Sequence, residues 1–333
     1  MHIQSTVRQG GEGVVLLLSA VKKPSTLQIN SLQGRILNSS MIRILGTIFA
    51  GLLGLAFGSF LNVCLSRWPA GESIVRPRSH CRHCNRTLAW WENVPLVSWL
   101  ALRGRCRTCH AWIGWRYPLV ELAVGGLWAV VAWKAFYPAV SYMDILPLDP
   151  PMVFVDAIFK MLLCWLLVAL AFLDAEHLWL PDWLTLPGIA LGFLSINLQA
   201  YLYERTFKIG IGVIGNAFVT LLCIVAATAL ILLIHWLYWL IRRREGIGLG
   251  DAKLMALLAA WLGLQGALLA FFLGVVLGAL VAVVMLLIPS ARRDSESWAL
   301  CKLPLGTFLC IGGIISSLWG DSVLAAYYRW AGF

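Results

Sequence analysis

Acidic residues at the ends of apolar segments are the side chains in this sequence best placed to do chemistry. Asp174, Glu176 and Asp182 fall within nine residues at the end of one apolar run, and Asp251 follows a glycine-rich turn at the start of another. Ionisable groups inside membrane segments are costly and usually functional. Two carboxylates that meet share a proton, because both cannot ionise comfortably. One then activates water as a base while the other donates a hydrogen bond to a carbonyl, which suits peptide hydrolysis.

Each of these acids also has a structural interpretation. Asp251 would satisfy free N–H groups and the macrodipole at a helix start, Asp182 would cap the helix that follows Pro181, and Glu176 would lie in water at the end of a span. The glycines before Asp251 either let an extended substrate strand approach the backbone or form a flexible turn: Gly246, Gly248 and Gly250. Spacing alone leaves open which of Asp174, Glu176 and Asp182 meets Asp251.

Four cysteines in a polar segment form the second group with chemical potential. They make two Cys-x-x-Cys motifs, separated by 21 residues: Cys81, Cys84, Cys106 and Cys109. Two such motifs can hold Zn²⁺ in a tetrahedral site, and four thiolates leave no open position for catalysis. The sequence therefore predicts a structural zinc site.

The surroundings of the cysteines extend this prediction and supply its alternatives. We expect four arginines to balance the negative charge of the thiolates: Arg82, Arg86, Arg105 and Arg107. The alternatives are redox-active or free thiols, or a site in which a neighbouring histidine replaces a cysteine: His80, His83 or His110.

The elements that position these residues are apolar helices. Hydrophobic residues make up 60% of the chain and charged residues 13%, and the mean hydropathy is +0.81. This composition predicts an all-α polytopic membrane protein. We expect about eight transmembrane helices, near 44–64, 117–137, 152–173, 184–200, 210–240, 252–265, 267–288 and 303–320. The fourth and sixth are short, so they are expected to be tilted or partly re-entrant.

The charge distribution predicts the orientation of these spans. The loops on one side carry sixteen Lys and Arg residues against three on the other. Because basic loops stay in the cytoplasm, this asymmetry places the loop 66–116, the turn 174–183, the Asp251 turn and the loop 289–302 there. The net charge of +10 is explained by these loops, so we expect no nucleic-acid partner.

Several ordered sequence blocks resemble one family, the type IV prepilin peptidases, which are bifunctional leader peptidases and N-methyltransferases. The blocks are GSFLNVCLSR at 58–67, the doubled Cys-x-x-Cys, VPLVSWLALRGRC at 94–106, YPLVELAVG at 117–125, LDAEHLWLPDWLTLP at 173–187, GLGDAKLMALLAAW at 248–261 and LPLGTFLCIGG at 303–313. Glu176 stands where many members have a second aspartate.

The resemblance implies an activity and the residues that perform it. It selects Asp174 to pair with Asp251 as the catalytic aspartates, and it assigns zinc to Cys81, Cys84, Cys106 and Cys109. It implies that a basic leader is cut, after a glycine, from prepilins or from pseudopilins of type II secretion. The new N-terminal residue is then methylated with S-adenosylmethionine. The expected location is the bacterial inner membrane, in contact with lipid, with the active site at the cytoplasmic face.

The apolar runs, the cysteine loop and the resemblance together divide the chain into segments. We expect an N-terminal extension that is either dispensable or the product of a mis-assigned start before Met41, a first span, a zinc-binding loop that is the candidate methyltransferase region, a peptidase domain and a tail: 1–42, 43–65, 66–116, 117–322 and 323–333. The S-adenosylmethionine-binding residues are not identifiable, because the chain has no glycine-rich nucleotide fingerprint.

Two other classes of protein fit part of the sequence. A transporter with carboxylates along its path would also carry acids in membrane helices, and it would have a structural zinc loop. The absence of an internal inverted repeat argues against it. A membrane-anchored zinc module that only recruits partners would leave the membrane acids without a role.

Overall fold

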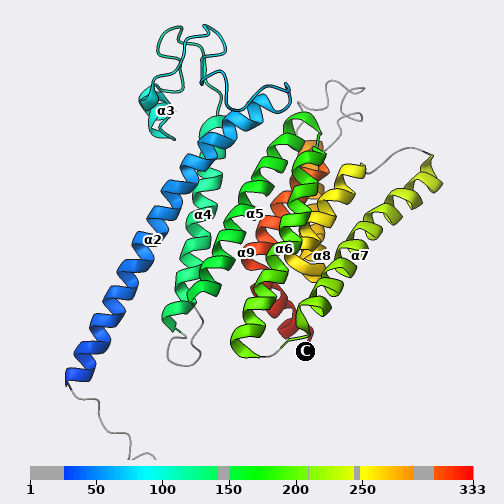
Figure 1. Cartoon of the computed structure of the whole chain (residues 1–333). Coiled ribbons are helices and arrows are strands. Elements are labelled where there is room, and N and C mark those ends of the chain that lie inside the picture. The colour runs from blue at the N-terminus through cyan, green and yellow to red at the C-terminus, as the bar shows by residue number, and fades with distance from the viewer. Residues whose placement is uncertain (1–25, 142–149, 209, 244–247, 288–303, 333) are drawn as a thin grey trace, which may run out of the picture. The chain divides into compact units, whose positions relative to one another are not determined.

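The computed structural model describes residues 26–141, 150–208, 210–243, 248–287 and 304–332 (Figure 1). These residues form eight α-helices and one short 3₁₀ helix, with no strand longer than an isolated bridge. The helices are α2 (Thr26–Arg67), α3 (Val97–Ala101), α4 (Arg116–Ser141), α5 (Pro150–His177), α6 (Asp182–Phe207), α7 (Gly212–Arg242), α8 (Leu249–Leu287) and α9 (Leu305–Ala331), and the 3₁₀ helix is η1 (Trp90–Asn93). All but α3 are long and apolar enough to span a membrane.

The chain divides into two units, Met1–Leu45 and Gly46–Phe333, and the boundary falls within α2. In the second unit, α2 approaches α4 closely because glycines line the contact. A Cβ added at Gly54 would lie 2.9 Å from the Cα of Gly125, and one added at Gly58 would lie 2.7 Å from the Cα of Glu121. Such small residues let membrane helices pack backbone to backbone.

The helix α5 lies at the centre of the second unit and packs against α4, α6 and α9. One face of α5 joins α2 and α4 in a buried apolar cluster that includes Leu61, Val120 and Leu173. Another face joins α8 and α9 in a second cluster that includes Leu167, Leu258 and Leu309. This packing fixes the end of α5, where the candidate acids lie.

A sharp turn divides α8 at Gly263. This residue has φ 68° and ψ −178°, a backbone conformation that is almost restricted to glycine. No other atom lies within 4 Å of a Cβ added there, so the backbone angle, and not space, accounts for the glycine. The helix therefore consists of two segments, before and after residue 263.

The two segments of α8 run in opposite directions along α9. Before the turn Leu258 lies beside Gly313, and after it the contacts return from Ser316 toward the start of α9. The contacts that show this order are Leu258 with Gly313, Gly266 with Ser316, Ala270 with Gly312, and Gly274 with Leu309. The element α8 is thus a helical hairpin, visible in Figure 1 as a descending yellow segment followed by a returning orange one.

This arrangement confirms the predicted all-α membrane architecture with a cysteine-containing loop after the first span. The expected sixth and seventh spans are the two segments of α8. The expected fourth span is longer than the pattern suggested, since α6 has 26 residues and continues through Pro187. The helix α9 continues to Ala331, past the expected end at 320.

Candidate active site

Asp174 lies in the last turn of α5 and is 6% exposed. The helix ends just beyond it because Leu178 adopts a positive φ of 50°, and the Leu178 N–H donates to the Asp174 carbonyl at 2.9 Å. The Asp174 carboxylate Oδ2 accepts the backbone N–H of Thr307 at 2.6 Å, and the Thr307 hydroxyl lies 3.1 Å away. The first turn of α9 therefore holds one oxygen of this carboxylate in place.

The residue before Thr307 has to be small. A Cβ added at Gly306 would lie 2.9 Å from both Cγ and Oδ2 of Asp174. Gly306 and Thr307 were not among the site residues predicted from the sequence. The available signal was a Pro-x-Gly-Thr sequence at the start of an apolar run, which marks a helix N-terminus but not its partner.

Replacing Gly306 with alanine is expected to lower the rate of the reaction that Asp174 takes part in by about 10²-fold. A displacement of about 1 Å at a reacting group changes a rate by that amount. The added methyl group would push the Asp174 carboxylate from its position. Gly320→Ala is the matched control on the same helix, where the added Cβ would meet Ser316 Oγ at 3.4 Å and Leu269 Cδ2 at 3.7 Å. Equal activities of the two variants in an initial-rate assay would contradict this interpretation.

Asp251 lies in the first turn of α8 and is 9% exposed. Its Oδ2 accepts the Gly248 N–H at 3.3 Å, so the carboxylate also caps its own helix as the structural interpretation expected. Gly250 faces inward, since an added Cβ would lie 3.3 Å from Leu180. A substrate strand therefore cannot approach the backbone from that side of Gly250.

The structure brings Asp174 and Asp251 near one another. Each carboxylate lies within range of the other's charge. Leu180 lies close to both Gly306, which is next to the Asp174 carboxylate, and Gly250, which precedes Asp251, because a Cβ added at either glycine would come within 3.3 Å of it. Within the described residues no hydrogen bond joins the two carboxylates, and no cation pairs with either. Two buried acids thus share one site without a compensating positive side chain.

The other two candidate acids have different surroundings. The Glu176 carboxylate pairs with Arg116 at 2.8 Å, and the Asp182 carboxylate pairs with Lys253. Both acids are exposed, which is the ordinary condition of a surface ion pair. Of the acids that spacing left open, Asp174 is the one that is buried beside Asp251.

Helix ends shape the electrostatics around the two aspartates. The N-termini of α8 and α9 both point at the site, and backbone N–H groups from these ends reach the carboxylates. The partial positive charge of a helix N-terminus stabilises an anion. The site can therefore hold one negative charge although its walls are apolar.

The four cysteines of the loop form a second site. Their Sγ atoms all lie within 4.8 Å of one another, and the Cys81 and Cys109 sulfurs are 3.7 Å apart. A tetrahedral site with Zn–S bonds of about 2.3 Å requires S–S distances of about 3.8 Å. No disulfide joins these thiols. The donor set and its spacing therefore fit a metal ion, and the neighbouring histidines do not belong to the cluster.

Two loop segments with the same fold build this cluster. In each, the N–H of the first cysteine donates to a carbonyl five residues later at 2.9 Å, and a residue with positive φ follows the second cysteine. An isolated bridge closes each segment. The equivalent pairs are Cys81 and Cys106, Asn85 (φ 53°) and His110 (φ 55°), and the bridges His80–Thr87 and Arg105–Trp112.

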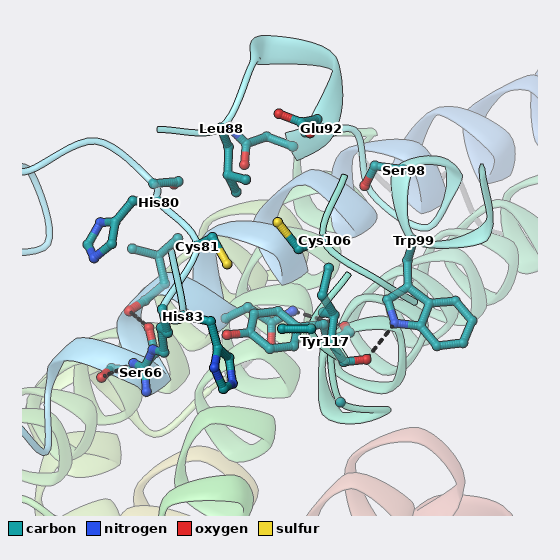
Figure 2. Close-up of a pocket in the computed structure, with 18 of the residues that line it drawn as sticks. Ser66, His80, Cys81, His83, Leu88, Glu92, Ser98, Trp99, Cys106 and Tyr117 are labelled. Atoms are coloured by element: carbon teal, nitrogen blue, oxygen red, sulfur yellow. Dashed lines mark hydrogen bonds between the residues drawn. The ribbon is translucent and has the colours of Figure 1, made fainter. Parts of the chain in front are cut away.

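Hydrogen bonds favour the thiolate form of Cys106, whereas burial and the neighbouring thiols raise the pKa of Cys109 to about 11. Backbone N–H groups of Cys109 and Thr108 donate to the Cys106 sulfur and lower its pKa to about 6. Figure 2 shows the Cys81 and Cys106 sulfurs side by side. A thiol that ionises near neutral pH is ready to bind a metal.

The arginines around the cluster have separate roles. Arg86 interacts with Cys106 and forms a 2.6 Å ion pair with the buried Glu92, whose pKa it lowers. Arg82 donates to the Ser66 carbonyl at 2.9 Å, and Arg107 lies over the Trp91 ring. The expected charge balance by four arginines is thus supported for Arg86, while Arg82 and Arg107 bind elsewhere.

Comparison with known proteins identifies the family. The model of the bacterial peptidase A24 N-terminal domain matches residues 52–135, and that of the type IV leader peptidase family matches residues 161–283. A prepilin leader peptidase/N-methyltransferase of Pseudomonas aeruginosa is 35% identical over 315 residues, covering 87% of this chain and 95% of that protein. The chain belongs to the type IV leader peptidase family.

Further relatives agree with this assignment. Proteins of the same name from Stutzerimonas stutzeri and Pseudomonas putida are 34% and 36% identical, over 83% and 84% of this chain and 92% of each relative. No solved structure shows significant similarity to the chain. The N-terminal domain match includes the four cysteines, and the leader peptidase match includes both Asp174 and Asp251 but ends before Gly306 and Thr307.

Proposed function

We propose that this member of the family cuts the basic leader from type IV prepilins or type II secretion pseudopilins and methylates the new N-terminus. The names of the relatives support both activities. The observation that carries the proteolytic part is the pair of buried acids, Asp174 and Asp251, neither of which pairs with a cation among the residues that the structure describes. A transporter would use such acids differently, and family membership favours the peptidase.

The hydrogen bonds support separate roles for the two aspartates. Asp174 Oδ2 accepts a short bond from the Thr307 N–H, whereas Asp251 accepts one longer bond from Gly248. A carboxylate that accepts N–H bonds is stabilised in its charged form. We therefore assign Asp174 as the base that deprotonates water, and Asp251 as the holder of the shared proton.

Peptide hydrolysis then follows from these roles. Asp174 removes a proton from a water molecule, whose oxygen attacks the scissile carbonyl carbon. Asp251 gives its proton to the carbonyl oxygen, so that no free oxyanion forms in the apolar site. When the tetrahedral intermediate collapses, the C–N bond breaks, and the proton held by Asp174 passes to the departing amine. The hydroxyl proton returns to Asp251.

Zinc in the four-cysteine cluster would have a structural role. Four thiolates fill its tetrahedral coordination, so the ion would fold the loop rather than activate water. When bound, S-adenosylmethionine supplies the methyl group. The loop 66–116 remains the candidate region for methyl transfer.

The orientation of the protein in the membrane determines where the aspartates meet the substrate. The chain is a multi-pass membrane protein, and we place both aspartates at the cytoplasmic face of the bacterial inner membrane. The excess of basic residues in the loops on that side supports this orientation. A prepilin whose leader lies in the cytoplasm and whose apolar helix lies in lipid would present its scissile bond at this level.

Mass spectrometry of the product tests both activities together. Purified full-length protein in detergent is mixed with a prepilin and S-adenosylmethionine. We expect the mature pilin to lose its leader and to gain the mass of one methyl group. Intact prepilin after prolonged incubation would contradict the proteolytic function, and an unmethylated mature pilin would contradict the transferase function.

A further inference from the structure

A cavity of about 840 Å³ lies between the cysteine loop and the ends of three helices, and the function proposed above does not yet use it. Residues of α2, the loop and the start of α4 line it, and Glu176 at the end of α5 completes the wall. In Figure 2, Trp99 lies to one side of the Cys81 and Cys106 sulfurs, and Tyr117 lies below them. Its volume accommodates a nucleoside-sized ligand, since small-molecule sites occupy about 300–1,000 Å³.

Two buried polar atoms in this lining have no hydrogen-bond partner. Asn62 is 2% exposed and donates through Nδ2 to the Tyr117 carbonyl at 2.9 Å, but its Oδ1 accepts nothing. Arg116 donates through Nη1 to Glu176 at 2.8 Å, but its buried Nε is unpaired. Buried polar groups are almost always satisfied, so an unpaired acceptor and an unpaired donor in one cavity indicate a polar ligand.

A third unpaired atom, Arg86 Nε, also borders the cavity. Arg86 interacts with Cys106 and with Glu92, so we assign it to the metal cluster. The two atoms that indicate a ligand are therefore Asn62 Oδ1 and Arg116 Nε.

Glu121 adds a buried carboxyl group to the same wall. This residue is 7% exposed, lines the cavity, and accepts the Leu96 N–H at 2.8 Å. The lining thus offers an acceptor at Asn62, a donor at Arg116 and a carboxylate at Glu121. That combination suits a ligand with one carboxylate and two positive groups.

We propose that this cavity binds S-adenosylmethionine, a proposal that rests on the methyltransferase part of the function. The ligand carboxylate would accept from Arg116 Nε, its α-ammonium would donate to Asn62 Oδ1, and its sulfonium would lie near Glu121. Trp99 and Tyr117 line the cavity, and the adenine would lie against their rings. Free nucleotides are a poorer match, because they lack the two positive groups.

The position of the cavity agrees with its proposed use. Glu176 borders the cavity and lies two residues after Asp174 on the same helix. The ion pair between Arg116 and Glu176 connects the start of α4 to this helix end. The methyl donor would therefore bind beside the peptidase site, where the new amino terminus is made.

Binding of S-adenosylhomocysteine, the stable product of methyl transfer, tests the proposal by isothermal titration calorimetry on the full-length protein in detergent. We expect Asn62→Leu and Arg116→Lys each to raise the Kd at least about 10-fold, because each removes one polar contact to the ligand. Asn197→Leu is the matched control, a buried asparagine on α6 that bonds to Phe193 and Asn216 outside the cavity. Its Kd is expected to equal that of the unsubstituted protein.

A second measurement uses the unsubstituted protein and so does not depend on how the variants fold. Ultraviolet irradiation with S-adenosylmethionine carrying a radioactive methyl group should label peptides from 59–67 or 111–121. Labelling confined to other segments, or unchanged Kd values in both cavity variants, would overturn the site while leaving the methyltransferase function in place. If the unsubstituted protein cleaves prepilin but neither binds the product nor methylates, the transferase function fails, and the proposed site fails with it.

Discussion

Asp174→Asn and Asp251→Asn are each expected to lower the rate of prepilin cleavage by about 10³-fold or more, since removal of a group that transfers protons in catalysis has effects of that order. Asparagine has nearly the same shape as aspartate, so the Thr307 and Gly248 N–H bonds can persist. It cannot take a proton from water, and it cannot hold the shared proton. Initial rates of leader removal measure the effect.

The matched control for these variants is Asp182→Asn. Asp182 follows Asp174 by eight residues in the sequence, and it pairs with Lys253, two residues after Asp251. Unlike the two aspartates, it is exposed. We expect its rate to stay within about 3-fold of the unsubstituted protein, because an exposed ion pair contributes little. If either the Asp174 or the Asp251 variant cleaves at a normal rate, that residue has no role in the chemistry.

Loss of the metal is expected to unfold the cysteine loop. The unsubstituted protein should hold about one zinc ion, and Cys81→Ser or Cys109→Ser should retain less than about a tenth of that, because a structural site needs all four ligands. The loop has little other support, since its regular structure within the described residues is limited to α3, η1 and two bridges. Elemental analysis measures the metal, and limited trypsin digestion at the loop arginines measures the folding.

Cys223→Ser supplies the control for the metal experiment. Cys223 lies on α7, outside the cluster, and its substitution should leave zinc content and trypsin resistance unchanged. Methyl transfer should fall with the metal, because the loop forms one wall of the cavity proposed for the methyl donor. Four intact thiols without zinc in the purified protein would refute the metal assignment.

Much of this architecture follows from local sequence patterns. Apolar runs predicted the long helices, and the two segments of α8 correspond in sequence to the expected sixth and seventh spans because Gly263 interrupts a run that is otherwise continuous. The repeated Cys-x-x-Cys predicted the cluster, since both halves carry the same turn. These features depend only on residues that are close in the sequence, so a local pattern is enough to predict them.

Contacts between distant helices were not predictable in the same way. The acids at 174, 176 and 182 looked equivalent until packing buried Asp174 and exposed Glu176 and Asp182. The support that Asp174 receives from Thr307 joins residues 133 positions apart, and no local pattern marks it. The unpaired Asn62 Oδ1 is likewise visible only once α2 and α4 are packed together.

The turn at Gly263 has a consequence for how the protein tolerates different lipids. Residues 249–262 rise only about 21 Å, less than the roughly 30 Å thickness of the hydrocarbon layer, so the helix that carries Asp251 cannot reach the far leaflet. The depth of this segment in the membrane is therefore set by the near leaflet and by its packing against α9. Thickening the bilayer would produce hydrophobic mismatch in the full-length spans, yet it would apply no direct pull to the Asp251 segment.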